Sequence, residues 1–230
     1  MRRYLVQTTD FSQYLSDIYT TFDTAFDDDR FKPINLALIG QILKHKYAHI
    51  SLNNLENNYL YQYFKKAFKN AVAFTTNYTD AFHKISNVKT HYLHGNFWEC
   101  YYSDDHEIGM CNYDNSVFKL NSFPYLMLQS AQKSFNIPQV RHRFNQFEEA
   151  VKTQNHLIII GYSFSKDDNH IHRIVETALK SNTQVFYFNY DNRNTIPKRL
   201  NTKCFYNIPY YHKGIKEGDA LISYINNHIE

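Results

Sequence analysis

The stretch Leu157-Ile158-Ile159-Ile160-Gly161 decides the fold class of this chain. Four consecutive apolar residues before a glycine are typical of a strand covered on both faces, as in a parallel sheet. Residues 167–180 follow with helical spacing, and Gln184-Val185-Phe186-Tyr187-Phe188-Asn189 forms a second apolar run. A strand, a helix and another strand in this order predict an α/β fold.

The same alternation extends to both sides of this central part. Apolar strand-like runs occur at residues 71–76, 91–93 and 204–206, and helical spacing occurs at residues 140–154 and 219–227. The segment 96–122, aromatic and rich in turn formers, predicts β-hairpin or loop structure. We therefore expect a Rossmann-like fold with a central parallel sheet.

The N-terminal third of the chain is different, because it is mainly helical in pattern. A short strand is expected at residues 4–6, and helices are expected at residues 11–22, 34–47 and 55–69. With 230 residues, the chain suits one domain. We expect a single domain over residues 1–230, in which a helical insertion of about residues 20–70 forms a small lobe.

Composition excludes several classes of protein. A hydrophobic share of 43% and a charged share of 20% rule out a disordered chain. The net charge of +3 is not gathered into a basic stripe, so nucleic acid is not indicated. No apolar run reaches the roughly 18 residues of a membrane span, and the N-terminus turns polar too soon for a signal peptide. We expect a cytoplasmic protein.

The cysteines also suit a cytoplasmic protein, whose thiols are kept reduced. Cys100, Cys111 and Cys204 are odd in number and scattered, so a disulfide framework is not expected. No CxxC pair exists, which excludes a zinc ribbon. His91 and His94 would point to opposite faces of one strand, so no metal site is expected there with Cys100 and Cys111. His170 and His172 are interpreted as surface or rim residues.

Polar clusters follow four of the predicted strands, at the edge where such sheets bind ligands. We expect all four on one edge of one sheet. They are Thr76-Asn77-Tyr78-Thr79-Asp80, His94-Gly95, Gly161-Tyr162-Ser163, and Asn189-Tyr190-Asp191.

These motifs, in this order, resemble those of the SIR2-like family. The segments that carry the resemblance are Phe74-Thr75-Thr76-Asn77-Tyr78-Thr79-Asp80, Tyr92-Leu93-His94-Gly95, Ile158-Ile159-Ile160-Gly161-Tyr162-Ser163-Phe164 with Asp167-Asp168, and Phe188-Asn189-Tyr190-Asp191. The match covers roughly residues 71–191 and is closest to the bacterial branch found in anti-phage proteins. The resemblance implies NAD as substrate or ligand, and either lysine deacylation or NAD hydrolysis as the reaction.

The resemblance also implies a role for each motif. Asn77 would position the nicotinamide ribose and the attacking water, and His94 would be the general base. Ser163 would hold ribose or phosphate at a helix N-terminus, and Asp191 would bind the adenosine ribose. Further residues expected to bind the cofactor are Thr76, Asp80, Gly161 and Asn189. Gly95 would let the backbone approach the ligand closely.

Two departures from the family pattern shape the expected function. The missing zinc ribbon argues against peptide deacylation. The place of the family's glycine loop is taken by Thr8-Thr9-Asp10, where side chains stand in the way of a diphosphate. We expect an NAD hydrolase, regulated by a partner protein or by homo-oligomerisation. The alternative is an inert nucleotide-sensing or interaction module, and a weaker third is a glycosyltransferase-like or oxidoreductase Rossmann enzyme.

Each site residue also has a structural interpretation that remains open. Asn77 suits a helix cap or turn, and His94 suits a structural histidine. Ser163 suits a loop hydroxyl, Asp191 a turn with Asn192, and Asp10 the cap of a helix over residues 11–22.

Overall fold

The computed structural model describes residues 59–68, 70–102, 107–110, 122–126, 137–189, 196, 198–200, 202–209 and 216–229. The chain divides into two compact units. Of the described residues, the first unit contains Thr75–Thr79 and those within His94–Gln139. The second unit contains the others, and each unit is described by itself.

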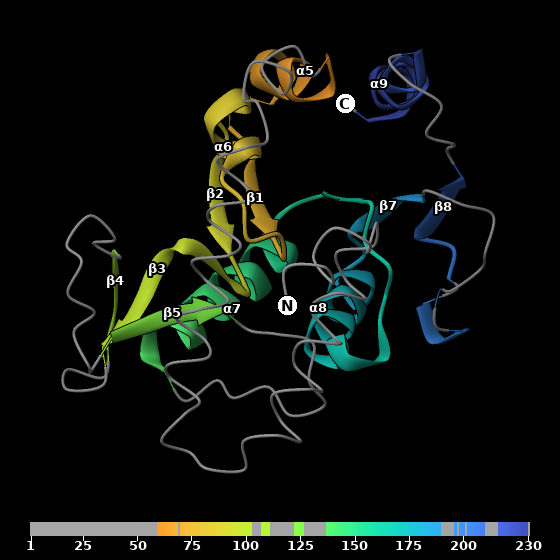
Figure 1. The fold of residues 1–230 in the computed structure, drawn as a ribbon. Coiled ribbons are helices and arrows are strands. Elements are labelled where there is room, and N and C mark those ends of the chain that lie inside the picture. The colour runs from red at the N-terminus through yellow and green to blue at the C-terminus, as the bar shows by residue number, and fades with distance from the viewer. Residues whose placement is uncertain are drawn as a thin grey trace, which may run out of the picture. The chain divides into compact units, whose positions relative to one another are not determined.

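The second unit is built on a parallel three-stranded sheet (Figure 1). Strands β6 (His156–Ile160), β7 (Gln184–Asn189) and β8 (Phe205–Pro209) lie in that order, with all neighbours parallel. The short 3-10 turn η1 (Lys166–Asp168) and helix α8 (Asn169–Lys180) connect β6 to β7. A second short turn, η2 (Lys198–Leu200), precedes β8. The parallel sheet and the α/β fold class predicted from the sequence are confirmed.

Strands β1 (Val72–Thr75) and β2 (Lys89–Tyr92) pair with each other and are joined by α6 (Ala81–Ser86). Among the described strands, no ladder joins this pair to β6, β7 and β8. The expectation that all four strand ends share one sheet is therefore wrong for the described part of the chain. Apolar runs predict where strands occur, but they do not determine which strands exchange hydrogen bonds.

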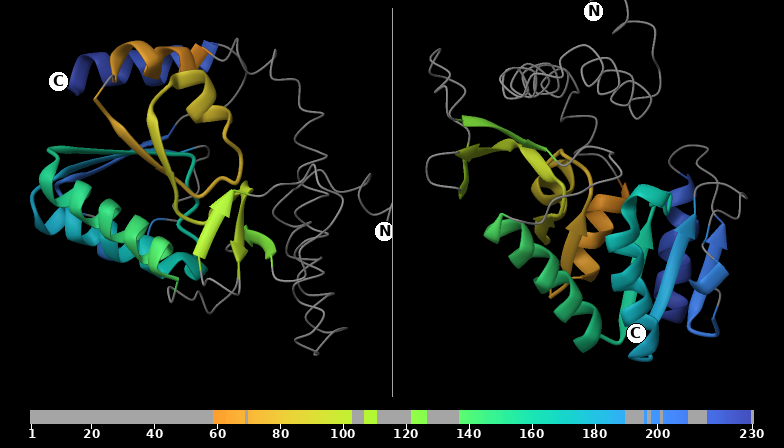
Figure 2. Two further views of the ribbon diagram at one scale, coloured as in Figure 1. Left: turned by 90° about the vertical axis from the view of Figure 1, so that its left-hand side faces the viewer. Right: turned by 90° about the horizontal axis from the view of Figure 1, so that it is seen from below.

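Helices cover both faces of the strand layer in the second unit (Figure 2). On one side lie α5 (Tyr59–Ala67) and α9 (Lys216–His228), linked by the Tyr63 hydroxyl, which donates to Asn226 Oδ1 at 2.7 Å. On the other side lie α7 (Pro138–Thr153) and α8. This three-layer arrangement is that of a Rossmann-like fold.

The core on the α5 and α9 side is built from α5, β7, α9 and the residue that precedes β2. Its buried members are Phe64, Val88, Phe186, Phe188, Leu221 and Ile225. Helix α5 thus packs into the main core of its unit, although it belongs to the segment expected to form a separate lobe. Residues 20–58 lie outside the described residues, so the lobe and the single-domain assignment stay predictions.

Helix α8 forms because its apolar residues recur at helical spacing. Ile171, Ile174, Val175 and Ala178 are all buried, which directs one face of the helix into the core. The helix ends at Ser181, whose backbone N–H bonds back to the last turn. Thr183 then returns the chain to β7 while its hydroxyl donates to the carbonyl oxygen of Val151 at 2.9 Å.

In the first unit, the described strands form an antiparallel sheet in the order β4, β3, β5. Its strands are β3 (Gly95–Tyr102), β4 (Glu107–Met110) and β5 (Ser122–Leu126). The predicted hairpin structure after residue 96 is confirmed. Cys100 on β3 is disulfide-bonded, and Cys204 in the second unit is a free thiol. The expectation of no disulfide framework did not include a bond at Cys100, because sequence spacing does not show which cysteines the fold brings together.

None of the helices in the described ranges is long and apolar enough to cross a membrane.

Candidate nucleotide site

The carboxyl edge of the parallel sheet brings two of the predicted residues together. Ile160 of β6 lies beside Phe188 of β7, so Gly161 and Asn189 come next on neighbouring strands. The Gly161 backbone N–H donates to the Phe188 carbonyl oxygen at 3.1 Å. This N–H is therefore already used inside the sheet. Gly161 has a φ of +64°, and a Cβ there would meet nothing within 4 Å, so its surroundings are open.

The buried ring of Phe164 holds the loop after β6 in place. Phe164 has a φ of +51°, in the left-handed region of the backbone. A bulky residue is rarely found there, because its Cβ makes this conformation unfavourable in energy. The Phe164 ring packs edge-on against Tyr187 at a centroid distance of 5.0 Å and against Tyr162 at 4.9 Å. The Tyr187 hydroxyl also donates to the Tyr162 carbonyl oxygen at 2.6 Å. These contacts fix the loop and leave Ser163 exposed between two anchored residues.

A buried carboxylate begins α8. Asp168 is 7% exposed and occupies the N-cap position, although its side chain makes no capping hydrogen bond. Burial, and then the Asp168 carboxylate nearby, raise the pKa of the Tyr162 hydroxyl far above its usual value. His170, the second residue of the helix, packs its ring edge-on against Phe144 at a centroid distance of 5.0 Å.

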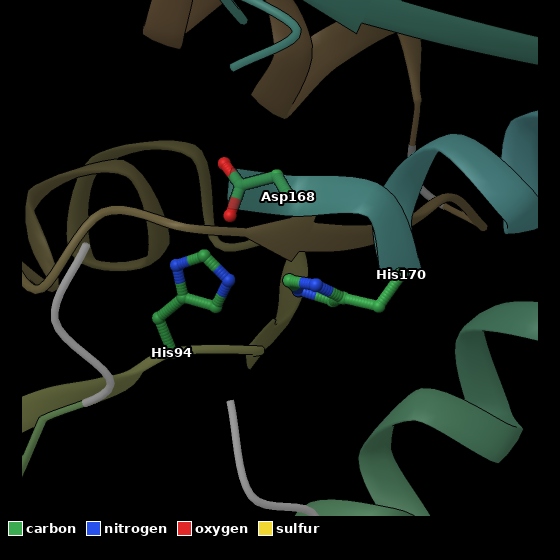
Figure 3. A group of neighbouring side chains, drawn as sticks. All are labelled: His94, Asp168 and His170. Carbon is green, nitrogen blue, oxygen red and sulfur yellow. The ribbon is translucent and has the colours of Figure 1, made fainter. Parts of the chain in front are cut away.

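Figure 3 draws Asp168 and His170 as sticks, together with His94, which belongs to the first unit. Asp168 and His170 each offer one metal-ligand atom, and these atoms lie within 4.8 Å of one another. Two ligands are fewer than the three or four protein ligands of a zinc site.

Asp168 also affects what α8 can bind. A helix N-terminus attracts anions through its free N–H groups and its dipole. A buried carboxylate at that position already supplies the negative charge and would repel a phosphate. The start of α8 is better suited to sugar hydroxyls, for which a carboxylate is an acceptor.

The end of β1 presents three further predicted residues. Thr76 is half-buried and Asn77 is exposed, with the Asn77 backbone N–H donating to Thr75 Oγ1 at 3.0 Å. Asp80, not Asn77, occupies the N-cap position of α6. Its carboxylate lies 2.8 Å from Lys84 Nζ, an ion pair along the helix. The Asn77 side chain is accordingly not the cap of this helix.

The end of β2 leads into a tight turn at Leu93 and His94. His94 is only 5% exposed, whereas an unconstrained histidine in a turn would be in water. Gly95 follows with a φ of +81°, and a Cβ there would overlap the carbonyl oxygen of Tyr125 and lie 2.8 Å from its Cδ1. Contact with β5 therefore accounts for this glycine, and the ligand approach expected from the sequence is not needed to explain it.

Other predictions have different outcomes. His172 is 3% exposed and packs near Phe164 at 5.4 Å, so its assignment to the surface is wrong. The helical spacing of α8 places it on the buried side with Val175. Asp191, Cys111 and Thr8-Thr9-Asp10 lie outside the described residues, as do the strand and helices expected over residues 4–47. The ligand roles of all the predicted site residues stay predictions.

Sequence reasoning gave no role to Phe164, Asp168 or Arg143. The signal for Asp168 was its place after the polar loop of β6. Nothing in the local pattern marks Phe164, whose left-handed backbone depends on contacts with β7. Arg143 is half-buried on α7, and the partner of its guanidinium, Tyr92, is 51 residues away in the sequence.

Comparisons with known proteins identify the fold. A sirtuin structure from work on substrate affinity covers 86% of this chain and 84% of its own, with a TM-score of 0.50 and 13% identity. A second structure from work on the same subject covers 90% of this chain and 83% of its own, with the same TM-score and identity. A Sir2 structure with a p53 peptide and NAD⁺ covers 73% of this chain and 68% of its own, with a TM-score of 0.45 and 14% identity.

No family model matches the sequence, and no curated protein matches it. The chain therefore has a SIR2-like fold, established by structure at low sequence identity.

Proposed function

We propose that this chain binds NAD and hydrolyses it to nicotinamide and ADP-ribose. The observation that carries the proposal is the placement of SIR2-type motifs at strand ends in a SIR2-like fold. The segments that carry Asn77 and His94 belong to the same compact unit, as a catalytic pair requires. His94, in addition, is only 5% exposed and precedes Gly95, where a Cβ would overlap the carbonyl oxygen of Tyr125.

The proposed reaction breaks the bond between the nicotinamide nitrogen and C1′ of its ribose. Nicotinamide leaves with the bonding electrons, and the ribose passes through an oxocarbenium-like state. The Asn77 amide would hold the ribose and a water, whose oxygen bonds to C1′. His94 would accept the proton of that water, since an imidazole has a suitable pKa for general base catalysis at neutral pH. The products are nicotinamide, ADP-ribose and one proton.

Water rather than a peptide is the proposed acceptor. The three cysteines of the chain do not have the paired spacing of a zinc ribbon, which the lysine deacylases of the resembled family contain. Asp168 supports a further detail, because its carboxylate disfavours a phosphate at the start of α8. Ser163 is then proposed to hold a ribose hydroxyl, with Thr76, Asp80, Gly161, Asn189 and Asp191 completing the cofactor contacts.

The first test is nicotinamide release from NAD, with NAD binding measured in parallel. We expect turnover by wild type, and at least a hundred-fold loss in both Asn77→Ala and His94→Ala with NAD still bound. Asn145→Ala and His142→Ala are matched controls, because both residues are exposed on α7. Loss of activity in the controls alone, or none in the site variants, would refute the assignment.

A second function is favoured by one observation. Asp168 places a carboxylate at the start of α8, where other Rossmann-like proteins bind a dinucleotide's phosphates, and the sequence has no glycine before Gly40 to form an N-terminal phosphate loop. Binding of NAD or ADP-ribose without turnover would identify the chain as a nucleotide-sensing module. A thermal shift on addition of either compound distinguishes this from a scaffold that binds neither.

A role in bacterial defence against phages is proposed on the resemblance alone. Hydrolysis of the cellular NAD pool would stop phage replication together with host metabolism. We expect expression of wild type, and not of His94→Ala, to lower plaque formation and cellular NAD during infection. Equal protection by both variants would separate defence from NAD hydrolysis.

A further inference from the structure

Helix α7 makes two contacts with the strands that lead to the proposed catalytic residues. The Arg143 guanidinium donates from Nη1 to the backbone carbonyl oxygen of Tyr92 at 3.0 Å. Tyr92 is the last residue of β2, and His94 follows it by two residues. Phe147, one turn further along α7, packs its ring against Phe74 of β1 at a centroid distance of 4.7 Å. Phe74 precedes Asn77 by three residues.

The helix is itself firmly held, so it can act as a fixed support. Val140, Phe144 and Phe147 recur at helical spacing and are all buried. Arg143 lies within this face and is half-buried, so its aliphatic stem is packed while its guanidinium reaches the strand. A charged donor makes a stronger hydrogen bond than a neutral one, and a partly buried bond is little weakened by water.

Arg143 is not needed to hold β2 in its sheet, because β2 pairs with β1 through the backbone. The guanidinium is bonded instead to the terminal carbonyl of the strand, at the point where the chain leaves the sheet and enters the turn. A shift of about 1 Å in a catalytic group can lower a rate by a hundred-fold. A bond at this place constrains the backbone where it enters the turn.

We propose that Arg143 is a positioning residue, which fixes the turn that carries His94 by holding the Tyr92 carbonyl. The inference rests on the proposed NAD hydrolysis for its kinetic consequence, and on the structure alone for its effect on the turn. Arg143 does not touch the substrate in this account. Loss of the Arg143 guanidinium should lower kcat and leave the KM for NAD nearly unchanged, because the contacts between the protein and the substrate remain.

The test compares three variants in the full chain. Arg143→Met keeps the apolar stem and removes every donor, Arg143→Lys keeps one charged donor, and Arg141→Met removes an exposed arginine from the same helix. We expect Arg143→Met to lower kcat about 10- to 100-fold with KM changed less than about twofold. Arg143→Lys should recover most of kcat, and Arg141→Met should match wild type. A rise in KM with unchanged kcat, or equal loss in Arg141→Met, overturns the proposal.

A spectroscopic measurement separates failure of this inference from failure of the proposed function. The ring signals of His94 are assigned in histidine-labelled protein by their loss in His94→Gln. We expect these signals to shift in Arg143→Met and to remain in place in Arg141→Met, whether or not wild type hydrolyses NAD. Unshifted His94 signals in folded Arg143→Met refute the positioning role. Shifted signals in a protein without NAD turnover refute only the hydrolase.

Discussion

Gly95 and Gly161 have similar backbone conformations and different surroundings, which makes them a matched pair. Both have positive φ, +81° and +64°, but only Gly95 has a neighbour in the way of a Cβ. We expect Gly161→Ala to cost about 1 kcal/mol, the backbone penalty alone. Gly95→Ala should cost clearly more, about 3 kcal/mol, because β5 must also move. Urea denaturation of both variants measures this, and equal losses would contradict the contact with Tyr125.

Tyr162 predicts a change of stability at alkaline pH. Burial and the nearby Asp168 raise its pKa above the ordinary 10.0, so the folded state keeps the proton that the unfolded state loses. The resulting stability is present below pH 10 and falls as the pH rises above it. We expect Tyr162→Phe to reduce this alkaline fall in the free energy of unfolding. Tyr206→Phe, at an exposed position on β8, is the control and should retain the wild-type pH profile.

At the scale of elements, α7 and β2 predict a linked titration. Burial lowers the pKa of His91, and the positive charges of Lys89, Arg143 and His142 lower it further, while its ring stacks on Phe74. Removing the charge in Arg143→Met should therefore raise the pKa of His91. The change is measured by following the His91 ring signals from pH 5 to 8. A pKa that stays the same, or falls, would place Arg143 away from β2.

His91 also sets a direction for stability in acid. Its folded pKa is below the unfolded value of 6.5, so the unfolded state binds the proton more readily. The stability that this contributes is present above pH 6.5 and is lost as the pH falls. We expect His91→Gln to lessen the loss of stability between pH 7 and 5. An unchanged acid profile would contradict the burial of this ring.

The elements were predictable from sequence to different degrees. Strand β7 was predicted at its observed bounds, because a turn and a polar cluster mark the two ends of its apolar run. Helix α8 followed from its spacing. The same spacing indicates the burial of His172, three residues before Val175, but not the contact of its ring with Phe164. The contact with β5 that requires a glycine at position 95 was not predictable either, because β5 lies about 30 residues further along the chain.

The candidate site was predictable only as a set of strand ends. Sequence order locates Asn77, His94 and Gly161 after strands, which is where α/β proteins bind ligands. It does not show that His94 is buried and Asn77 exposed, nor that Asp168 at the start of α8 is buried. These properties come from packing between distant segments.

At the scale of the whole molecule, the second unit depends on its C-terminal helix. Leu221 of α9 is 1% exposed and belongs to the same core as Phe64 and Phe188. We expect Leu221→Ala to lower the free energy of unfolding by about 3 kcal/mol. Ser223→Ala, exposed on the same helix, should change it by less than about 0.5 kcal/mol. Similar effects of the two substitutions would show that α9 is not part of this core.

We propose that the SIR2-like fold of this chain uses water to cleave NAD. The most direct test of this proposal is the reaction of wild type and His94→Ala with NAD in isotopically labelled water. We expect nicotinamide and ADP-ribose in equal amounts, one labelled oxygen in each ADP-ribose, and at least a hundred-fold less of both products with His94→Ala. Absence of both products from wild type, or undiminished turnover by His94→Ala, would contradict the proposal.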